Sequence, residues 1–206
     1  MSGFASIYGG SGDDVLFPSV LNQNNYIDGR GGDDVIAALG GNDTVLGGGG
    51  DDVVLAGAGN DVVFGEGGAD QIFGEEGDDG LFGGSGADSL FGGSGQDTLF
   101  GEGGEDILIG GADDDTMAGG GGADAFGFED GFGNDLIIGF QIGSDILQIV
   151  GNINGSGVSL PDDVVPFVSA DGFGNAVITL GSDSITLQGV SVGDVTANIA
   201  TIVQIV

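Results

Sequence analysis

Aspartates that recur every nine residues are the side chains of this sequence best placed to do chemistry. They occupy every ninth position from residue 34 to residue 124, and Asp14 precedes the series. Each is the sixth residue of a unit whose first, second and fourth positions are mostly glycine, as in residues 83–91. Glycines at these positions permit the positive backbone angles of a tight turn, which brings a carboxylate and several backbone carbonyl oxygens together. Hard oxygen ligands in a flexible loop suit Ca²⁺ better than zinc, copper or magnesium, so we expect the turns to bind calcium.

The candidate metal ligands are of two kinds. The candidate carboxylates are Asp14, Asp34, Asp43, Asp52, Asp61, Asp70, Asp79, Asp88, Asp97, Asp106, Asp115 and Asp124. The candidate backbone carbonyls, named here for the two most regular units, are those of Gly83, Gly84, Gly86, Gly92, Gly93 and Gly95.

The elements that must position these ligands follow from the last three residues of each unit, whose middle residue is apolar. Leu90 and Leu99 are examples. Because successive side chains of a strand point to opposite faces, the middle residue can point inward while its neighbours point outward. Two units then close one rung of turn, strand, turn and strand. Stacked rungs give two parallel sheets around a thin aliphatic core.

The composition excludes several functions. The chain has 206 residues, 33 acidic and one basic side chain, 49 glycines and neither histidine nor cysteine, and its formal net charge is −32. With Arg30 as its only cation it cannot neutralise nucleic-acid phosphates. Histidine-based zinc sites, Ser-His-Asp triads, thiol chemistry and disulfides all need side chains that it lacks. We expect neither a transmembrane segment, since no apolar run of about 18 residues occurs, nor an N-terminal secretory signal.

The repeated unit resembles the nonapeptide repeat of RTX proteins, Gly-Gly-x-Gly-x-Asp-x-apolar-x, over residues 9–17 and 29–127. This resemblance implies an all-β fold, a calcium-bound parallel β-roll solenoid. It also implies that each ion lies between two turns stacked on the same edge, for example between Asp34 and Asp52. Eleven turns paired with their second neighbours give 11 − 2 = 9 sites, so we expect about nine ions. Turns in which Ala38, Leu39, Ala56 or Asp113 replaces glycine are expected to bind weakly or not at all.

Calcium should decide whether the chain is folded. Glycine loses much backbone freedom on ordering, and stacked aspartates repel one another, so metal binding should supply much of the folding free energy. Without calcium the same sequence should behave as a flexible acidic linker. Family resemblance implies export by the type I secretion machinery, which reads a C-terminal signal, and hence a secreted, extracellular or cell-surface location.

We divide the chain into three parts. Residues 1–28 hold an N-terminal repeat and an excursion loop, residues 29–127 form the RTX nonapeptide β-roll, and residues 128–206 form a β-rich cap and secretion-signal region. In the last part, residues 175–180 and 184–187 are expected to form a hairpin. The apolar tail, residues 199–206, reads as one more strand. A cap is needed because a solenoid must cover its last rung.

Two classes of function stay open, and catalysis is not expected because no cleft is implied. The first is a secreted structural protein that folds on meeting extracellular Ca²⁺ and self-associates in a surface layer, matrix or filament. Outward apolar stripes, one on each sheet, could mediate that association; they comprise Leu46, Phe64, Phe82 and Phe100, and Leu55, Phe73, Phe91 and Ile109. The second is a calcium-dependent secretion and folding module of an RTX toxin or hydrolase. The short segment before the first repeat favours the first class.

Overall fold

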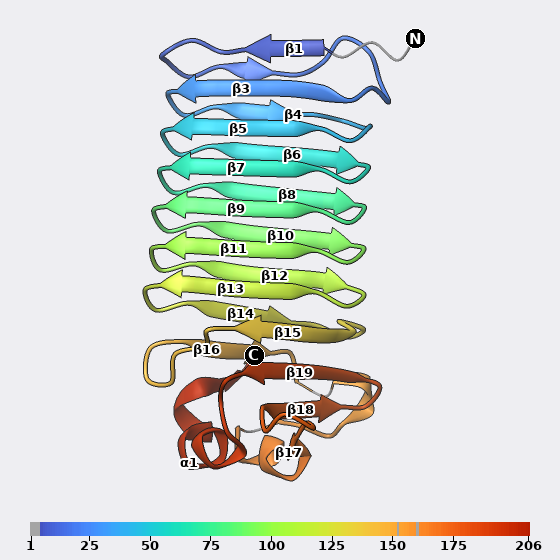
Figure 1. The fold of residues 1–206 in the computed structure, drawn as a ribbon, viewed down its shortest axis with the longest axis vertical. Helices are drawn as coiled ribbons and strands as arrows, with labels where there is room; N and C mark the ends of the chain where they lie inside the picture. The colour runs from blue at the N-terminus through green and yellow to red at the C-terminus, as the bar shows by residue number, and fades with distance from the viewer. Residues whose placement is uncertain (1–4, 152, 160) are drawn as a thin grey trace.

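Two facing sheets wind together into a long column (Figure 1). The computed structural model describes residues 5–151, 153–159 and 161–206. The chain alternates between the sheets, so each strand pairs in parallel with the strand two places away in the sequence. The predicted parallel β-roll is confirmed.

The strands fall into an eleven-stranded and a nine-stranded sheet. In spatial order the eleven-stranded sheet contains β1 (Ala5–Tyr8), β3 (Asn25–Gly31), β5 (Thr44–Gly49), β7 (Val62–Gly67), β9 (Gly80–Ser85), β11 (Thr98–Gly103), β13 (Thr116–Gly121), β15 (Asn134–Ile138), β19 (Asp183–Gln188), β18 (Ala176–Leu180) and β17 (Val168–Ala170). The nine-stranded sheet contains β2 (Val15–Leu16), β4 (Val35–Ala37), β6 (Val53–Ala58), β8 (Gln71–Glu76), β10 (Ser89–Ser94), β12 (Ile107–Ala112), β14 (Ala125–Phe128), β16 (Ile146–Ile149) and β20 (Val203–Ile205).

The core is a single file of apolar side chains between the sheets. Every eighth-position side chain from Ile36 to Phe126 has 0% of its surface exposed, which confirms that the middle residue of each strand points inward. Register keeps the file continuous, since Leu90 pairs with Ile72 on one side and Leu108 on the other. Burial of this file is the main apolar contribution to stability.

The turns use glycine for two different reasons. Second- and fourth-position glycines have positive φ, for example 110° at Gly84 and 138° at Gly86. First-position glycines such as Gly83 do not share this angle; a Cβ there would instead collide with oxygen atoms. We expected positive angles at all three positions, and at the first position close approach is the actual reason.

The excursion loop predicted up to residue 28 is shorter in the structure. Residues 20–28 repeat the nine-residue pattern after a slip of two residues, with Asn25 in sixth and Ile27 in eighth place. Asn25 begins β3, which pairs with both β1 and β5, and the Ile27 side chain is fully buried. The roll therefore begins before residue 29.

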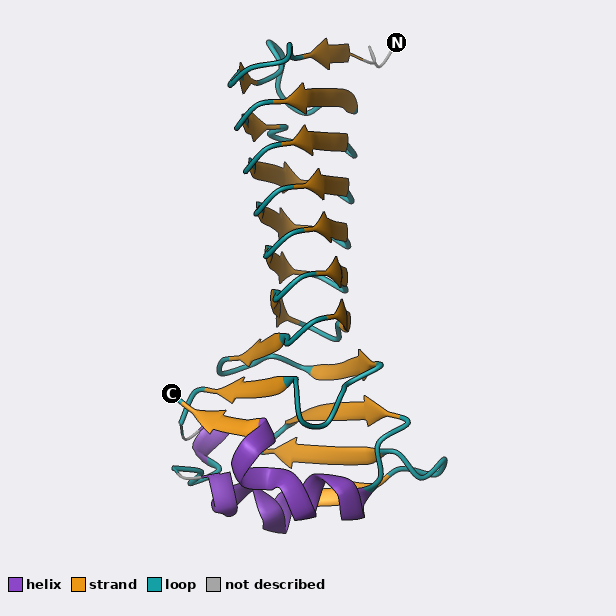
Figure 2. Cartoon of the chain, turned by 90° about the vertical axis from the view of Figure 1, so that its left-hand side faces the viewer, coloured by secondary structure: helices purple, strands orange, loops and turns teal. Residues whose placement is uncertain are grey.

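The C-terminal region covers the last rungs with strands and helices (Figure 2). The hairpin β18–β19 forms as predicted and joins β15 in parallel. Two short 3-10 helices, η1 (Ile153–Gly155) and η2 (Pro161–Phe167), and the helix α1 (Val192–Ile202) pack beneath it. Across the residues that the structure describes, no helix has the length and apolar character needed to cross a membrane.

The strand predicted over residues 199–206 is wrong in its first half. Residues 199–202 belong to α1, and only β20 (Val203–Ile205) is extended, paired with β16. Ser191 caps α1 by accepting the Asp194 N–H, and the Asp194 side chain accepts from the Ser191 N–H in return. This capping box, with Val195, Ile199 and Ile202 buried on one face, outweighs the β propensity of the branched residues.

Candidate metal centre

The repeated aspartates form two ladders, one along each edge of the roll. The first edge carries the turns that lead from the eleven-stranded to the nine-stranded sheet, and the second edge carries the turns that lead back. Along the first edge lie Asp14, Asp34, Asp52, Asp70, Asp88, Asp106, Asp124 and Asp145. Along the second edge lie Asn25, Asp43, Asp61, Asp79, Asp97, Asp115 and Asp135.

One oxygen of each ladder carboxylate ties neighbouring rungs together. The backbone N–H of Asp70 donates to Oδ1 of Asp88 at 2.8 Å, and the N–H of Asp79 donates to Oδ1 of Asp97 at 2.8 Å. The same bond recurs in every rung, so each aspartate is held at a fixed height in the stack.

The second oxygen of these carboxylates has no partner. Oδ2 is buried and makes no hydrogen bond within the described chain at Asp34, Asp43, Asp52, Asp61, Asp70, Asp79, Asp88, Asp97, Asp106, Asp115, Asp124 and Asp135. A buried polar atom without a partner costs free energy, and a buried charge costs far more. A buried carboxylate oxygen that lacks a partner in rung after rung indicates a ligand that supplies positive charge.

In most turns a carbonyl oxygen from the next rung lies close to the unpartnered carboxylate oxygen. An ideal Cβ built on Gly83 would lie 2.5 Å from Oδ2 of Asp88 and 2.9 Å from the carbonyl oxygen of Gly101. We call the space beside such a first-position Cα the cradle of the turn. The same pair of oxygens lines the cradles of Gly9, Gly29, Gly47, Gly65, Gly74, Gly92 and Gly101.

The electrostatics of the ladders fit a cation. Burial raises the pKa of Asp61, Asp70, Asp97 and Asp115 to about 7, and that of Asp135 to about 8. Backbone N–H donors partly oppose this rise, and neighbouring carboxylates add to it. Negative charge is therefore costly in the ladders unless a cation offsets it.

The predicted glycine ligands separate into two groups. The carbonyl oxygens of Gly83 and Gly92 face the cradles of Gly65 and Gly74 in the preceding rung. Those of Gly86 and Gly93 instead lie against the second- and fourth-position glycines of the following rung, Gly104 and Gly111. The first-position carbonyl is thus the one that shares its cradle with an orphaned carboxylate.

Both ladders extend beyond the residues predicted from spacing. Oδ1 of Asp135 accepts the Asp115 N–H at 3.0 Å, and Oδ1 of Asp145 accepts the Asp124 N–H at 3.3 Å. Asn25 takes the place of aspartate at the start of the second edge. One or two extra residues between units shift these positions out of the strict nine-residue spacing, so the spacing alone does not predict them. A glycine two residues earlier nevertheless marks Asp135 and Asp145.

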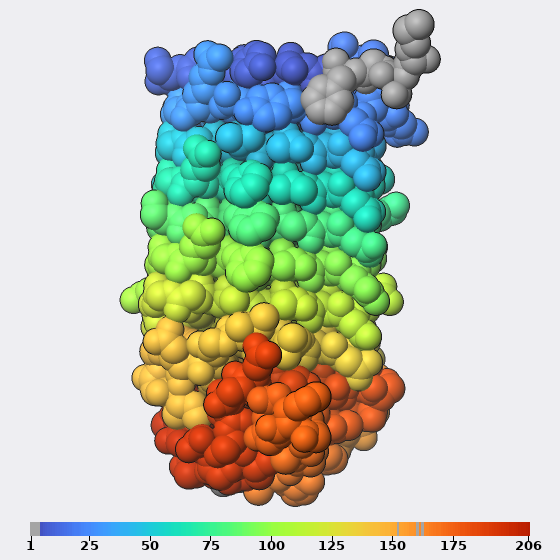
Figure 3. Space-filling view, viewed as in Figure 1, coloured from blue at the N-terminus to red at the C-terminus, as the bar shows by residue number. Residues whose placement is uncertain are grey.

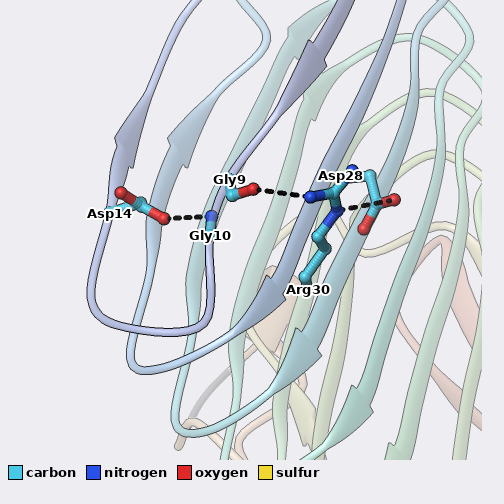
Figure 4. A network of polar contacts seen from close by, with 5 residues as sticks. All are labelled: Gly9, Gly10, Asp14, Asp28 and Arg30. Carbon is cyan, nitrogen blue, oxygen red and sulfur yellow. Dashed lines mark hydrogen bonds and ion pairs between the residues drawn. The ribbon is translucent and has the colours of Figure 1, made fainter.

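The first edge begins at Asp14 and Arg30 (Figure 4). Asp14 is half-buried, and its Oδ2 accepts the Gly10 N–H at 2.6 Å. A guanidinium nitrogen of Arg30 donates to the Gly9 carbonyl at 3.2 Å, and the group lies 5.1 Å from the centre of the Tyr8 ring. The Gly9 carbonyl corresponds to those that face cradles deeper in the stack, so the only cation of the chain meets the terminal carbonyl.

Together these groups can bind a hard cation. Within the described residues no three acidic side chains converge on one point, so an ion would need backbone carbonyls as well as a carboxylate. All the converging donors are oxygen, as calcium prefers. The donor set therefore fits Ca²⁺, which the sixth-position aspartates and first-position carbonyls would bind.

Comparison with known proteins agrees with this chemistry. The family described as RTX calcium-binding nonapeptide repeat (4 copies) matches residues 3–18, 21–54, 46–81, 55–90, 74–108 and 91–126. No curated protein matches the chain.

Two solved structures are similar to this chain. Extracellular lipase LipA from Serratia marcescens is 22% identical, with a TM-score of 0.40, and the alignment covers 100% of this chain and 40% of the lipase. The AlgE6R3 subunit of the Azotobacter vinelandii mannuronan C5-epimerase is 27% identical, with a TM-score of 0.43, covering 60% of this chain and 74% of that subunit. This chain therefore spans less than half the length of the lipase.

The family assignment rests on the sequence match, which extends over more than half of the chain. The ladders of buried aspartates offer oxygen atoms of the kind that calcium prefers. The chain belongs to the RTX calcium-binding nonapeptide repeat family and forms a calcium-binding module of the RTX type.

Proposed function

We propose that this chain is a secreted, non-enzymatic protein that folds on meeting extracellular Ca²⁺ and self-associates as a component of a cell-surface layer, matrix or filament. The observation that carries the proposal is the run of buried, unpartnered Oδ2 atoms along both edges. Calcium, when bound, supplies the positive charge that these atoms lack.

Folding and metal binding are coupled because the ladders are costly without ions. Each ladder stacks carboxylates in successive rungs at a parallel-strand spacing of roughly 4.8 Å, close enough for strong repulsion. An ion at ten times its dissociation constant contributes roughly 1.4 kcal/mol to the folded state. Sites of extracellular modules bind at about 0.1–1 mM, so the chain would stay unfolded in a calcium-poor cytosol and fold outside. This fits export through the type I secretion machinery.

Self-association is supported by aromatic columns on both outer faces. Phe64 stacks on Phe82 at 4.8 Å and Phe82 on Phe100 at 5.4 Å, measured between ring centres. On the other sheet Phe73 stacks on Phe91 at 4.8 Å. All five rings are half-buried. Figure 3 shows the outer surface of the roll from the same side as Figure 1. A continuous apolar stripe of this kind marks a surface that can pair with a second copy.

A calcium titration followed by circular dichroism and light scattering tests the proposal. We expect β-sheet signal to appear cooperatively with calcium, to disappear on chelation, and to be accompanied by a mass above that of one chain. An ordered calcium-free chain at about pH 8 would refute the coupling. A strictly monomeric calcium form would instead favour the alternative function, a secretion and folding module of a larger RTX toxin or hydrolase.

A further inference from the structure

The two edges of the roll differ in their first rungs at the position that lines the cradle. Along the first edge the first-position residues are glycine from the start, at Gly9, Gly29 and Gly47. Along the second edge the corresponding residues are Val20, Ala38 and Ala56, and glycine appears only from Gly74 onward. Both alanine side chains are completely buried.

A methyl group does not fit in a cradle of this shape. In the eight glycine cradles described above a Cβ would stand at 3.0 Å or less from both the carboxylate oxygen and the carbonyl oxygen that a cation would join. A methyl group at this position, as Ala38 and Ala56 carry, would require the two oxygens to move apart and would take up space that an ion needs. Oδ2 of Asp43 and Asp61 still has no hydrogen-bond partner in the described chain, so what differs is access for the ion.

The distribution of charge changes at the same turns. In the first three turns of the first edge the fifth and sixth residues are all acidic, namely Asp13 with Asp14, Asp33 with Asp34, and Asp51 with Asp52. The neighbouring second-edge turns carry Asn24 with Asn25, Asn42 with Asp43, and Asn60 with Asp61. At these positions the first edge therefore carries six carboxylates and the second edge carries two. At the next second-edge turn, glycine returns at Gly74 and an acid returns at Asp78.

Asparagine side chains make hydrogen bonds between these rungs of the second edge. Oδ1 of Asn24 accepts the Asn42 N–H at 3.0 Å, and Oδ1 of Asn42 accepts the Asn60 N–H at 3.3 Å. At the start of the ladder, the backbone and side-chain N–H groups of Asn25 both donate to Oδ1 of Asp43, at 2.6 and 2.9 Å. Amide groups make these bonds without adding charge that a metal ion would have to balance.

We propose that the second edge binds no calcium at Ala38 and Ala56, and that its first rungs are stacked by asparagines instead. Calcium then binds at the turns of the whole first edge, whereas on the second edge it binds only from the turn of Gly74 onward. The proposal rests on the proposed calcium-dependent function, and it assigns which turns of the repeat carry that function.

Replacing the alanines by glycine tests this assignment by adding sites. The wild-type chain and the A38G/A56G variant are dialysed against the same saturating calcium concentration, and bound calcium per chain is measured by atomic emission. We expect the variant to bind up to two more ions than the wild type. Ala58→Gly, at an exposed third position in the turn of Ala56, is the matched control and should leave the number unchanged.

A substitution of glycine by alanine gives a second test of the same assignment. Gly74→Ala should remove one ion, and circular dichroism checks that each variant is folded. An A38G/A56G variant that binds the wild-type number of ions overturns the proposal, as does a calcium-bound crystal structure with ions at Asp43 and Asp61. A wild-type chain that binds no calcium at all would instead refute the proposed function.

Discussion

Each ladder carboxylate divides its two oxygens between two tasks. Oδ1 of Asp88 accepts a backbone N–H from the rung before it and fixes the spacing of the stack. Oδ2 of the same residue is left for a cation. An amide side chain could keep the first task while weakening the second, so asparagine substitution separates rung stacking from metal binding.

Asp88→Asn combined with Asp97→Asn tests this division in the middle of both ladders. We expect the calcium concentration at the folding midpoint to rise several-fold, because each weakened site removes roughly 1.4 kcal/mol of linkage at ten times its dissociation constant. Circular dichroism at a series of calcium concentrations measures the midpoint. Asp78→Asn, at an exposed fifth position, is the control. An unchanged midpoint in the double variant would mean that these carboxylates are not ligands.

The pH dependence of the calcium-free chain follows from the buried carboxyl groups. Burial raises the pKa of Asp61, Asp70 and Asp97 from 3.8 to about 7 in the folded chain. The folded state therefore holds these protons more tightly than the unfolded state, so their contribution to stability is complete below pH 3.8 and is lost as the pH rises past 7. Without calcium, we expect β-sheet signal in circular dichroism to increase between about pH 8 and about pH 5. A decrease over that interval would contradict the prediction.

At the scale of elements, the sequence predicts the regular part well because one rule repeats. Glycine, aspartate and an apolar residue recur in phase, and strands and core follow from this pattern alone. The rule fails where the phase slips, so Asn25 and Asp135 were not predicted as members of the ladders. It fails again at α1, where local capping and an apolar face compete with the β propensity of Val192, Val195 and Ile199.

Ser191→Ala tests the capping box that begins α1. Loss of the side-chain acceptor for the Asp194 N–H should cost roughly 1 kcal/mol and lower the melting temperature of the calcium-bound chain. Ser191→Asp, which keeps an acceptor at this position, should restore most of the loss. Equal melting temperatures for the alanine variant and the wild type would show that packing alone holds the helix.

At the scale of the whole molecule, the roll presents two long apolar columns on a strongly acidic body. Phe82→Thr with Phe91→Thr interrupts both columns and keeps residues that favour strands. Under the proposed function, we expect the calcium-bound variant to have a lower mass by light scattering than the wild type, with unchanged circular dichroism. An unchanged mass would show that the chains do not associate through these columns.

Strand pairing also fixes how the roll can change in length. Ile72, Leu90 and Leu108 pair in one sheet at intervals of 18 residues, and the other sheet takes the alternate units. Deletion of residues 83–100 removes one full winding and leaves every later strand in its original sheet. Deletion of residues 83–91 sends each later strand to the opposite sheet and separates the cap from its partners. With calcium present, circular dichroism should show a folded chain for the longer deletion and an unfolded one for the shorter. Genetic duplication or loss can therefore resize this protein only by pairs of units.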